Sequence, residues 1–310
     1  MNKILRVGVV GVGSMGKEHV RILKKLKNCL LVGIVDKDLR SIDLVAERFS
    51  TTAFKKLDDL FAKNIDAISI CTPTSSHFQI ARQALEKNVH TLIEKPITKT
   101  VYQAEKLIDL AEKKKLKLMV GYVERFNPIV AAIKVRIKGE SVISVNFTRV
   151  GPIPPRVKNI GITLDLATHD IDLLRYLLET NFKKIESVSS TQNNQEDAAI
   201  LSFKLGNGTI ASIVTNWYTP YKVRKIEVAT KNKFIIGDFI TQEVYEYSNY
   251  KLDGSYLTKK IPIKKIEPLE EELKSFIESI ELNTTPQVTG EDGLEALKVA
   301  VRCSELASQK

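Results

Sequence analysis

The chain has 310 residues, enough for two domains and for a core that needs neither disulfides nor a structural metal. Hydrophobic residues make up 43% of the sequence and charged residues 27%, close to the globular average, which argues against a disordered or fibrous protein. No apolar run approaches the roughly 20 residues of a membrane span. The first residues lack the cleavage site of a secretory signal.

The net charge of +10 raises the possibility of nucleic-acid binding. The lysine clusters are scattered, however, and no DNA-binding helix pair is visible, so we expect solvated faces and no nucleic-acid partner. A positive chain still attracts anionic small molecules. Cys29, Cys71 and Cys303 lie far apart in the sequence, which argues against a disulfide framework or zinc site. We therefore expect a cytoplasmic protein, with no metal and no membrane association.

The first 120 residues alternate between strand and helix patterns. This alternation predicts a parallel, doubly wound sheet with right-handed crossovers, an α/β fold of the Rossmann type. Asp38 is the expected N-cap of the second helix. The expected strands are 6–12, 31–35, 52–54, 67–71, 91–94 and 117–120. The expected helices are 14–26, 38–49, 58–62, 76–86 and 98–114.

The pattern changes after Gly121 to a series of strands with few helices. Asn127 and Pro128 have the positions of an N-cap and a first helical residue, opening a helix that runs to 138. Two glycines at 206 and 208 indicate a hairpin. The second half is therefore an α+β domain with a large, mainly antiparallel open sheet. We expect its open face to be covered by a homodimer or homotetramer contact. The expected strands are 142–150, 185–191, 199–205, 209–215, 225–230, 233–236, 244–247 and 256–263, and the further helices are 165–179, 269–282 and 292–307.

A glycine-rich turn, G-x-G-x-x-G, follows the first strand and opens the first helix at Gly11–Gly16. Gly11 permits the tight turn, Gly13 leaves room for a pyrophosphate, and Gly16 lets helix and strand pack closely. The helix N-terminus then offers N–H groups to the phosphates. Asp36 follows the next strand and would bind the adenosine ribose while repelling a 2′-phosphate. These features predict NAD as the cofactor in preference to NADP.

Two further segments carry titratable groups. Lys95 lies between Glu94 and Pro96 at the end of a predicted parallel strand, where such sheets bind ligands; an ordinary surface lysine before a turn is the alternative. Asp165 and His169 are four residues apart on a predicted helix, so the carboxylate can orient the imidazole. A solvent-facing polar stripe is the alternative there. We interpret the remaining histidines, His19 and His90, as structural.

Four motifs in this order resemble the Gfo/Idh/MocA oxidoreductase family over nearly the whole chain: Gly11–Gly16, Cys71–His77, Glu94-Lys95-Pro96 and Asp165-x-x-x-His169. The resemblance implies that Lys95 lies beside the nicotinamide and the reacting hydroxyl, and that Asp165 and His169 complete the site from the second domain. It also implies that Cys71–His77 lies along the cofactor and that the last helix packs back on the first domain. We expect an NAD-binding domain at 1–122, a substrate and oligomerisation domain at 123–288, and a C-terminal helix at 289–310.

Three segments resemble more closely members of this family described as UDP-N-acetylglucosamine 3-dehydrogenases: 121–128, 149–156 and 164–176. A nucleotide-sugar diphosphate needs cations, and Arg125 and Arg156 are the candidates because guanidinium pairs with phosphate through two hydrogen bonds. A structural ion pair is the alternative for each arginine. A dehydrogenase of a free sugar, inositol or related polyol, and a non-catalytic NAD-sensing protein, are the alternative functions.

The predicted site therefore has three groups of residues. The catalytic residues are Lys95, His169 and Asp165, and either Lys95 or His169 takes the proton of the substrate hydroxyl. The expected cofactor-binding residues are Gly11, Val12, Gly13, Ser14, Met15, Gly16, Asp36, Lys37, Cys71, Thr72, Pro73, His77, Glu94 and Lys95. The expected substrate-binding residues are Tyr122, Arg125, Asn127, Arg156 and Asp172.

Overall fold

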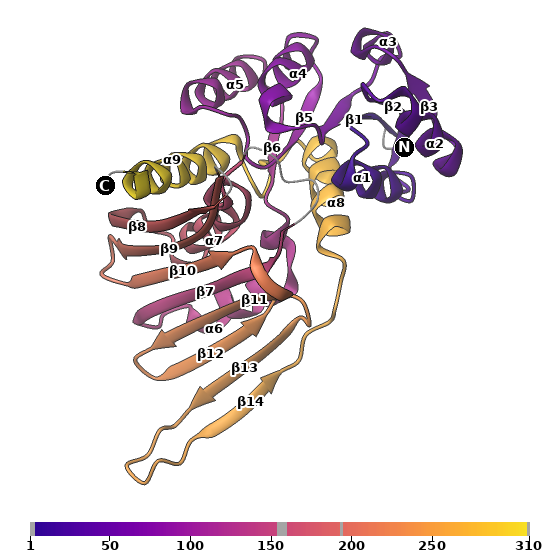
Figure 1. Cartoon of the computed structure of the whole chain (residues 1–310). Coiled ribbons are helices and arrows are strands. Elements are labelled where there is room, and N and C mark those ends of the chain that lie inside the picture. The colour runs from indigo at the N-terminus through magenta and orange to yellow at the C-terminus, as the bar shows by residue number, and fades with distance from the viewer. Residues whose placement is uncertain (1–3, 154–159, 193–194, 309–310) are drawn as a thin grey trace. The chain divides into compact units, whose positions relative to one another are not determined.

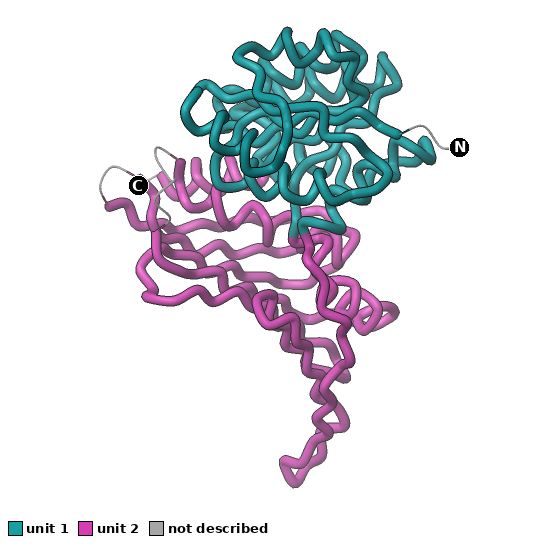
Figure 2. Tube along the Cα trace, turned by 90° about the vertical axis from the view of Figure 1, so that its right-hand side faces the viewer, with its two compact units in different colours: residues 1–123, 269–297 teal, residues 124–268, 298–310 magenta. Residues whose placement is uncertain are grey.

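The computed structural model describes residues 4–153, 160–192 and 195–308 (Figure 1). The chain packs into two compact units, one made of residues 1–123 and 269–297 and the other of residues 124–268 and 298–310 (Figure 2). The first break, after residue 123, lies next to the expected boundary at 122, whereas residue 288, the other expected boundary, lies inside the first unit. Most of helix α8 (Pro268–Glu281) belongs to the first unit, and the last residues of helix α9 (Gly290–Ser308) belong to the second.

The first unit contains a parallel six-stranded sheet with the strand order β3-β2-β1-β4-β5-β6 (Figure 1). The order reverses between β1 and β4, which is the switch point where sheets of this kind bind dinucleotides. The predicted Rossmann architecture is thereby confirmed. The strands are β1 (Leu5–Val10), β2 (Cys29–Val35), β3 (Thr52–Phe54), β4 (Ala67–Ile70), β5 (His90–Glu94) and β6 (Leu118–Gly121).

Helices connect consecutive strands of this sheet, and α1 packs against α2 while α4 packs against α5. Right-handed crossovers on either side of the switch point place these two pairs on opposite faces. Asp38 caps α2 as predicted, because its side chain accepts hydrogen bonds from the N–H groups of Arg40 and Ser41. The connecting helices are α1 (Ser14–Leu23), α2 (Leu39–Phe49), α3 (Leu57–Phe61), α4 (Thr74–Glu86) and α5 (Val101–Lys113).

The second unit contains an eight-stranded sheet with the order β14-β13-β12-β11-β7-β10-β9-β8. Every neighbouring pair is antiparallel except β7 with β10, which are parallel. Strand β11 begins seven residues earlier than predicted, and its register breaks between Tyr218 and Val223, around Pro220, which has no N–H to donate. The strands are β7 (Val142–Pro152), β8 (Phe182–Gln192), β9 (Gln195–Leu205), β10 (Ile210–Asn216), β11 (Tyr218–Thr230), β12 (Lys233–Asp238), β13 (Glu243–Ser248) and β14 (Leu257–Ile261).

One face of this sheet is covered by helices. The side chains of Ile129 and Ile133 in helix α6 pack over Gly237 of β12, and Asn127 and Pro128 open this helix as predicted. The helical elements of this unit are η1 (Val123–Phe126), α6 (Pro128–Ile137), η2 (Thr163–Ala167) and α7 (Thr168–Leu178).

The other face of the sheet carries a row of exposed apolar side chains. Val188, Ile200 and Val214 are cross-strand neighbours on β8, β9 and β10 and are 72%, 56% and 37% exposed. Such a face is typical of a surface that another chain covers. Within residues 4–153, 160–192 and 195–308, none of the helices has both the length and the apolar character needed to cross a membrane.

Candidate functional site

The turn between β1 and α1 is closely packed at two glycines and open at the third. Gly11 has a positive φ of 89°, and a Cβ atom there would lie 2.8 Å from the backbone of Cys71. A Cβ at Gly16 would lie 1.8 Å from the carbonyl oxygen of Gly11. A Cβ at Gly13 would meet nothing within 4 Å. The first two glycines therefore allow backbone segments to touch, whereas Gly13 borders open space at the helix terminus.

This terminus fits the pyrophosphate of a dinucleotide. Gly13 is the N-cap of α1, and no side chain of the described residues caps the helix, so the amide groups of its first turn remain available. Gly13 and Ser14 are exposed and Met15 is half-buried. Free N–H groups and the positive end of the helix dipole stabilise phosphate charge.

Asp36 lies at the end of β2 and joins this turn to the neighbouring strand. Its Oδ2 accepts a hydrogen bond from the Val12 N–H at 2.6 Å, and its Oδ1 accepts one from the Asp38 N–H at 2.9 Å. Each carboxylate oxygen keeps a further lone pair for a ribose hydroxyl. Lys37, the next residue, is exposed.

The segment Cys71–His77 follows β4, on the other side of the switch point. Thr72 accepts a hydrogen bond from the Ser76 hydroxyl at 2.9 Å, and Pro73 is exposed. The ring of His77 is buried, with Nδ1 2.9 Å from the carbonyl oxygen of Pro96 and Nε2 2.8 Å from that of Thr72. Burial lowers the pKa of His77, so a neutral ring donates to one carbonyl at a time. His77 therefore holds two loops together, and the cofactor contact expected of it stays a prediction.

Glu94 ends β5, and Lys95 follows it at the same edge of the sheet as the glycine turn. Lys95 is half-buried, and the peptide bond between Lys95 and Pro96 is cis, which the sequence did not indicate. The backbone N–H of Lys95 donates to Glu94 Oε2 at 3.2 Å. The Glu94 carboxylate therefore contacts the backbone of the next residue, Lys95.

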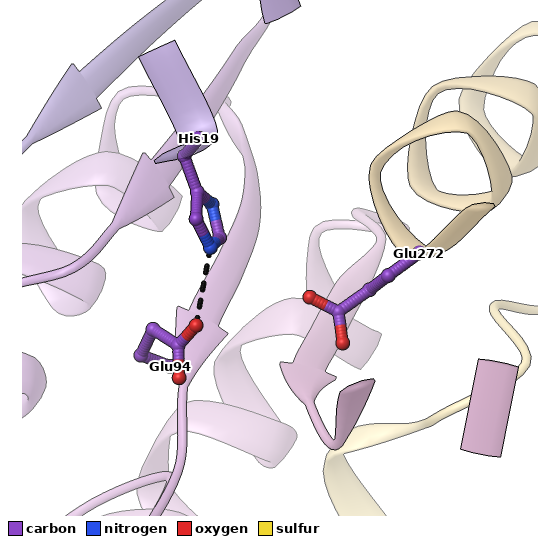
Figure 3. A group of neighbouring side chains, drawn as sticks. All are labelled: His19, Glu94 and Glu272. Carbon is purple, nitrogen blue, oxygen red and sulfur yellow. Dashed lines mark hydrogen bonds and ion pairs between the residues drawn. The ribbon is translucent and has the colours of Figure 1, made fainter. Parts of the chain in front are cut away.

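Glu94 also belongs to a buried cluster with His19 and Glu272 that sequence reasoning missed (Figure 3). A signal was present, because Glu272 interrupts the apolar face of α8 between Leu269 and Phe276. A charge on such a face predicts a buried ionisable group.

Asp165 and His169 lie in the second unit, at the junction of η2 and α7. The sequence predicts one α-helix over 165–179, but the structure has a π-helix at Thr163–Ala167 that continues as an α-helix from Thr168. The prediction of a single α-helix was wrong, because π-helical turns have no distinct sequence period. Such turns are frequent at functional sites. Asp165 is buried and His169 is half-buried.

The two other aspartates of α7 form buried ion pairs. Arg149 binds both carboxylate oxygens of Asp170 and also contacts Glu124 at 2.8 Å. Burial would lower the pKa of Arg149, but the two carboxylates raise it, so its guanidinium stays charged. Arg125 donates from Nε to Asp172 Oδ2 at 2.7 Å, and both side chains are buried.

The Arg125–Asp172 pair is the structural arrangement that the sequence left open as the alternative for this arginine. Asn127 is also engaged within the unit, because its amide donates to the Phe239 carbonyl at 3.0 Å and its oxygen caps α6. Tyr122 is buried. Arg156 lies outside the described residues.

Comparisons with known proteins cover most of the chain. The family model described as "Oxidoreductase family, NAD-binding Rossmann fold" matches residues 5–122, and the "GFO/IDH/MocA C-terminal domain" model matches residues 142–235. UDP-N-acetylglucosamine 3-dehydrogenase from Acidithiobacillus ferrooxidans is 27% identical over 303 residues, covering 96% of each chain. Its solved structure superposes with a TM-score of 0.90 over 97% of each chain. Myo-inositol 2-dehydrogenase from Thermotoga maritima is 24% identical and covers 99% of this chain and 97% of its own.

A substitution at Gly13 can test cofactor binding without changing the stability of the fold. In Gly13→Ala the methyl group meets no protein atom, so we expect an unchanged melting temperature without cofactor. The Kd for NAD, measured by calorimetry, should rise at least about tenfold, because a displaced phosphate loses charged hydrogen bonds worth about 1.5–3 kcal/mol each.

Gly16→Ala is the matched control, because its methyl group overlaps the Gly11 carbonyl. We expect it to destabilise the protein by about 1–3 kcal/mol. Unchanged NAD binding in Gly13→Ala would contradict the assignment of this helix terminus to the pyrophosphate.

Proposed function

The chain belongs to the Gfo/Idh/MocA family and is an NAD-dependent oxidoreductase acting on CH–OH groups, and we propose that its substrate is a nucleotide sugar. The specific reaction proposed is the oxidation of UDP-N-acetylglucosamine at C3 of the sugar ring. The observation that carries this proposal is the 27% identity to an enzyme of that name, spread over 96% of both chains.

The position of Lys95 supports its assignment to an alcohol-oxidising site. It follows a parallel strand at the cofactor edge of the sheet, and the hydrogen bond from its N–H to Glu94 fixes the backbone from which its side chain extends. We assign Lys95 to polarise the reacting hydroxyl and to take part in removing its proton. An ammonium or amine at this position interacts directly with the alcohol oxygen.

His169 and Asp165 are assigned to the same site from the second unit. A neutral imidazole has one ring nitrogen that can accept a proton, which suits His169 to accept the proton of the substrate hydroxyl. Asp165 would orient that ring or bind a neighbouring sugar hydroxyl. Bound NAD supplies the acceptor for the hydride that leaves the substrate carbon. The alcohol is oxidised to a ketone, and its hydroxyl proton passes to Lys95 or His169.

The diphosphate of the proposed substrate needs a cationic side chain that is not already held in a structural ion pair. Arg125 is held by Asp172 inside the second unit, so we assign it to that ion pair. Arg156 is the remaining arginine from the sequence motif, and we propose that it binds the diphosphate.

We also propose that the protein is cytoplasmic and forms a homodimer or homotetramer through the open face of the second sheet. The exposed row of Val188, Ile200 and Val214 supports this contact. Ile200→Lys should shift the sedimentation coefficient toward that of a monomer. An oligomer with an unchanged sedimentation coefficient would place the interface elsewhere.

The proposed cytoplasmic location is supported by the three cysteines, which are free thiols, in keeping with a reducing compartment.

Replacing Lys95 tests the catalytic assignment. Lys95→Met keeps the length of the side chain and removes its charge, so kcat should fall by about 10²–10⁴-fold, the usual contribution of a positioned acid or base. The Kd for NAD should stay within about threefold of the wild-type value, because Lys95 lies outside the pyrophosphate cradle. Lys99→Met is the control, since Lys99 is exposed four residues away. A kcat within tenfold of wild type in Lys95→Met would contradict the assignment.

A substrate panel tests the proposed reaction. NADH formation is followed by absorbance with UDP-N-acetylglucosamine, myo-inositol and free hexoses, each with NAD or NADP. We expect a signal with the nucleotide sugar and NAD, and its KM should rise in Arg156→Ala while kcat changes little. A signal only with a free polyol would assign the chain to the inositol dehydrogenases of the family. Silence across the panel, together with measurable NAD binding, would favour the NAD-sensing alternative.

A further inference from the structure

Three ionisable side chains from three elements meet inside the first unit. His19 comes from α1, Glu94 from β5 and Glu272 from α8, and Figure 3 shows all three pointing toward one another. One ligand-type atom from each residue lies within 4.8 Å of the others. His19 and Glu272 are fully buried and Glu94 is 8% exposed.

The histidine ring connects two strands of the sheet. Its Nδ1 lies 2.8 Å from the Ser69 hydroxyl oxygen, and its Nε2 lies 3.1 Å from Glu94 Oε1. A carboxylate only accepts, so Nε2 carries a proton. The other oxygen of Glu94 accepts the N–H of Lys95. Gly121 leaves room for this carboxylate, because a Cβ there would lie 3.3 Å from Glu94 Oε2. His19 thus reaches the backbone of Lys95 through one side chain.

Glu272 differs from Glu94 in its surroundings. Neither oxygen of its carboxyl group has a hydrogen-bond partner among the described residues, although the side chain is fully buried. A buried carboxylate without a partner is far more costly than a neutral carboxylic acid. The nearby charge of Glu94 adds repulsion to that cost.

The pKa values of the three residues are shifted in directions that together favour one distribution of charge. Burial would lower the pKa of His19, but the Cys71 sulfur and the Glu94 carboxylate raise it well above its ordinary value. Burial would raise the pKa of Glu94, yet the hydrogen bond and charge of His19 lower it. Burial and the charge of Glu94 raise the pKa of Glu272 well above its ordinary value. These directions favour one imidazolium that balances one carboxylate, with a proton on the second carboxyl group.

We propose that His19, Glu94 and Glu272 form a buried proton-holding network in which Glu272 is a neutral acid and His19 is a positioning residue that fixes Lys95 through Glu94. The positioning role rests on the function proposed for Lys95, whereas the protonation state of Glu272 does not. The groups facing the network are Ser69 on β4, Cys71 directly after that strand, His77 on α4 and Lys95 after β5.

The protonation state is tested by the pH dependence of stability. The folded protein holds a proton on Glu272 that the unfolded chain releases above pH about 4.3. A group whose pKa is raised by folding stabilises the protein at low pH and loses that contribution as pH rises. The unfolding constant of the wild type, relative to Glu272→Gln, should therefore rise by up to about tenfold per pH unit above pH 5, and then level off. Urea titrations followed by circular dichroism from pH 5 to 9 measure this ratio.

Glu270→Gln is the control, because Glu270 is exposed on the same helix. The ratio of the wild-type unfolding constant to that of Glu270→Gln should not change with pH. A flat ratio for Glu272→Gln would show that Glu272 is ionised in the folded protein and would overturn the proposal. One equivalent of a divalent metal, found by plasma mass spectrometry in protein dialysed against EDTA, would also overturn it, because a cation would then neutralise both carboxylates.

The positioning role is tested at His19. His19→Phe keeps a ring but removes the donor to Glu94, and we expect kcat to fall about tenfold while the KM for NAD stays within twofold. His19→Gln, whose amide can donate from the same position, should recover at least half of the wild-type kcat. An unchanged kcat in folded His19→Phe, or equal losses in both variants, would overturn the positioning role. A pH-independent unfolding ratio for Glu272→Gln would overturn the protonation state of Glu272 without changing the kinetic result for His19. The two parts of the proposal can therefore fail separately.

Discussion

The first unit depends on the contact between Gly16 and the carbonyl oxygen of Gly11, where there is no space for a side chain. This contact seats the start of α1 directly over the end of β1, so that the helix terminus opens at the switch point of the sheet. Asp36 then anchors the same turn from β2 through the Val12 N–H. The predicted position of the cofactor therefore depends on backbone packing more than on side chains.

The two units neutralise their buried charges differently. In the second unit each buried aspartate of α7 beyond His169 has its own arginine: Asp170 binds Arg149, and Asp172 binds Arg125. Removing one partner would leave an uncompensated buried charge, so these arginines are constrained by folding. The first unit instead gathers two carboxyl groups around one histidine. That cluster includes Glu94, whose side chain accepts a hydrogen bond from the Lys95 N–H, so it links the buried charges of this unit to the lysine that we propose as catalytic.

Features with a regular period or a local cap could be predicted from the sequence, and these include the alternating strands and helices, the glycine turn and the Asp38 cap. Features set by tertiary partners could not. The parallel pairing of β7 with β10 joins residues 66 apart in the sequence, such as Ser144 and Ile210, and no local signal encodes it. The π-helical turn at Asp165 has no distinct sequence period. The guanidinium of Arg125 suits it to bind phosphate, but the fold places Asp172 against it.

In the reaction that we propose, a hydride leaves C3 of UDP-N-acetylglucosamine for the nicotinamide. The most direct measurement supplies UDP-N-acetylglucosamine carrying deuterium only at C3, with NAD, and determines the mass and proton spectrum of the reduced cofactor. The mechanism predicts NADH with one deuterium at C4 of the nicotinamide. NADH that contains no deuterium, or no NADH at all from a protein that binds NAD, would contradict it.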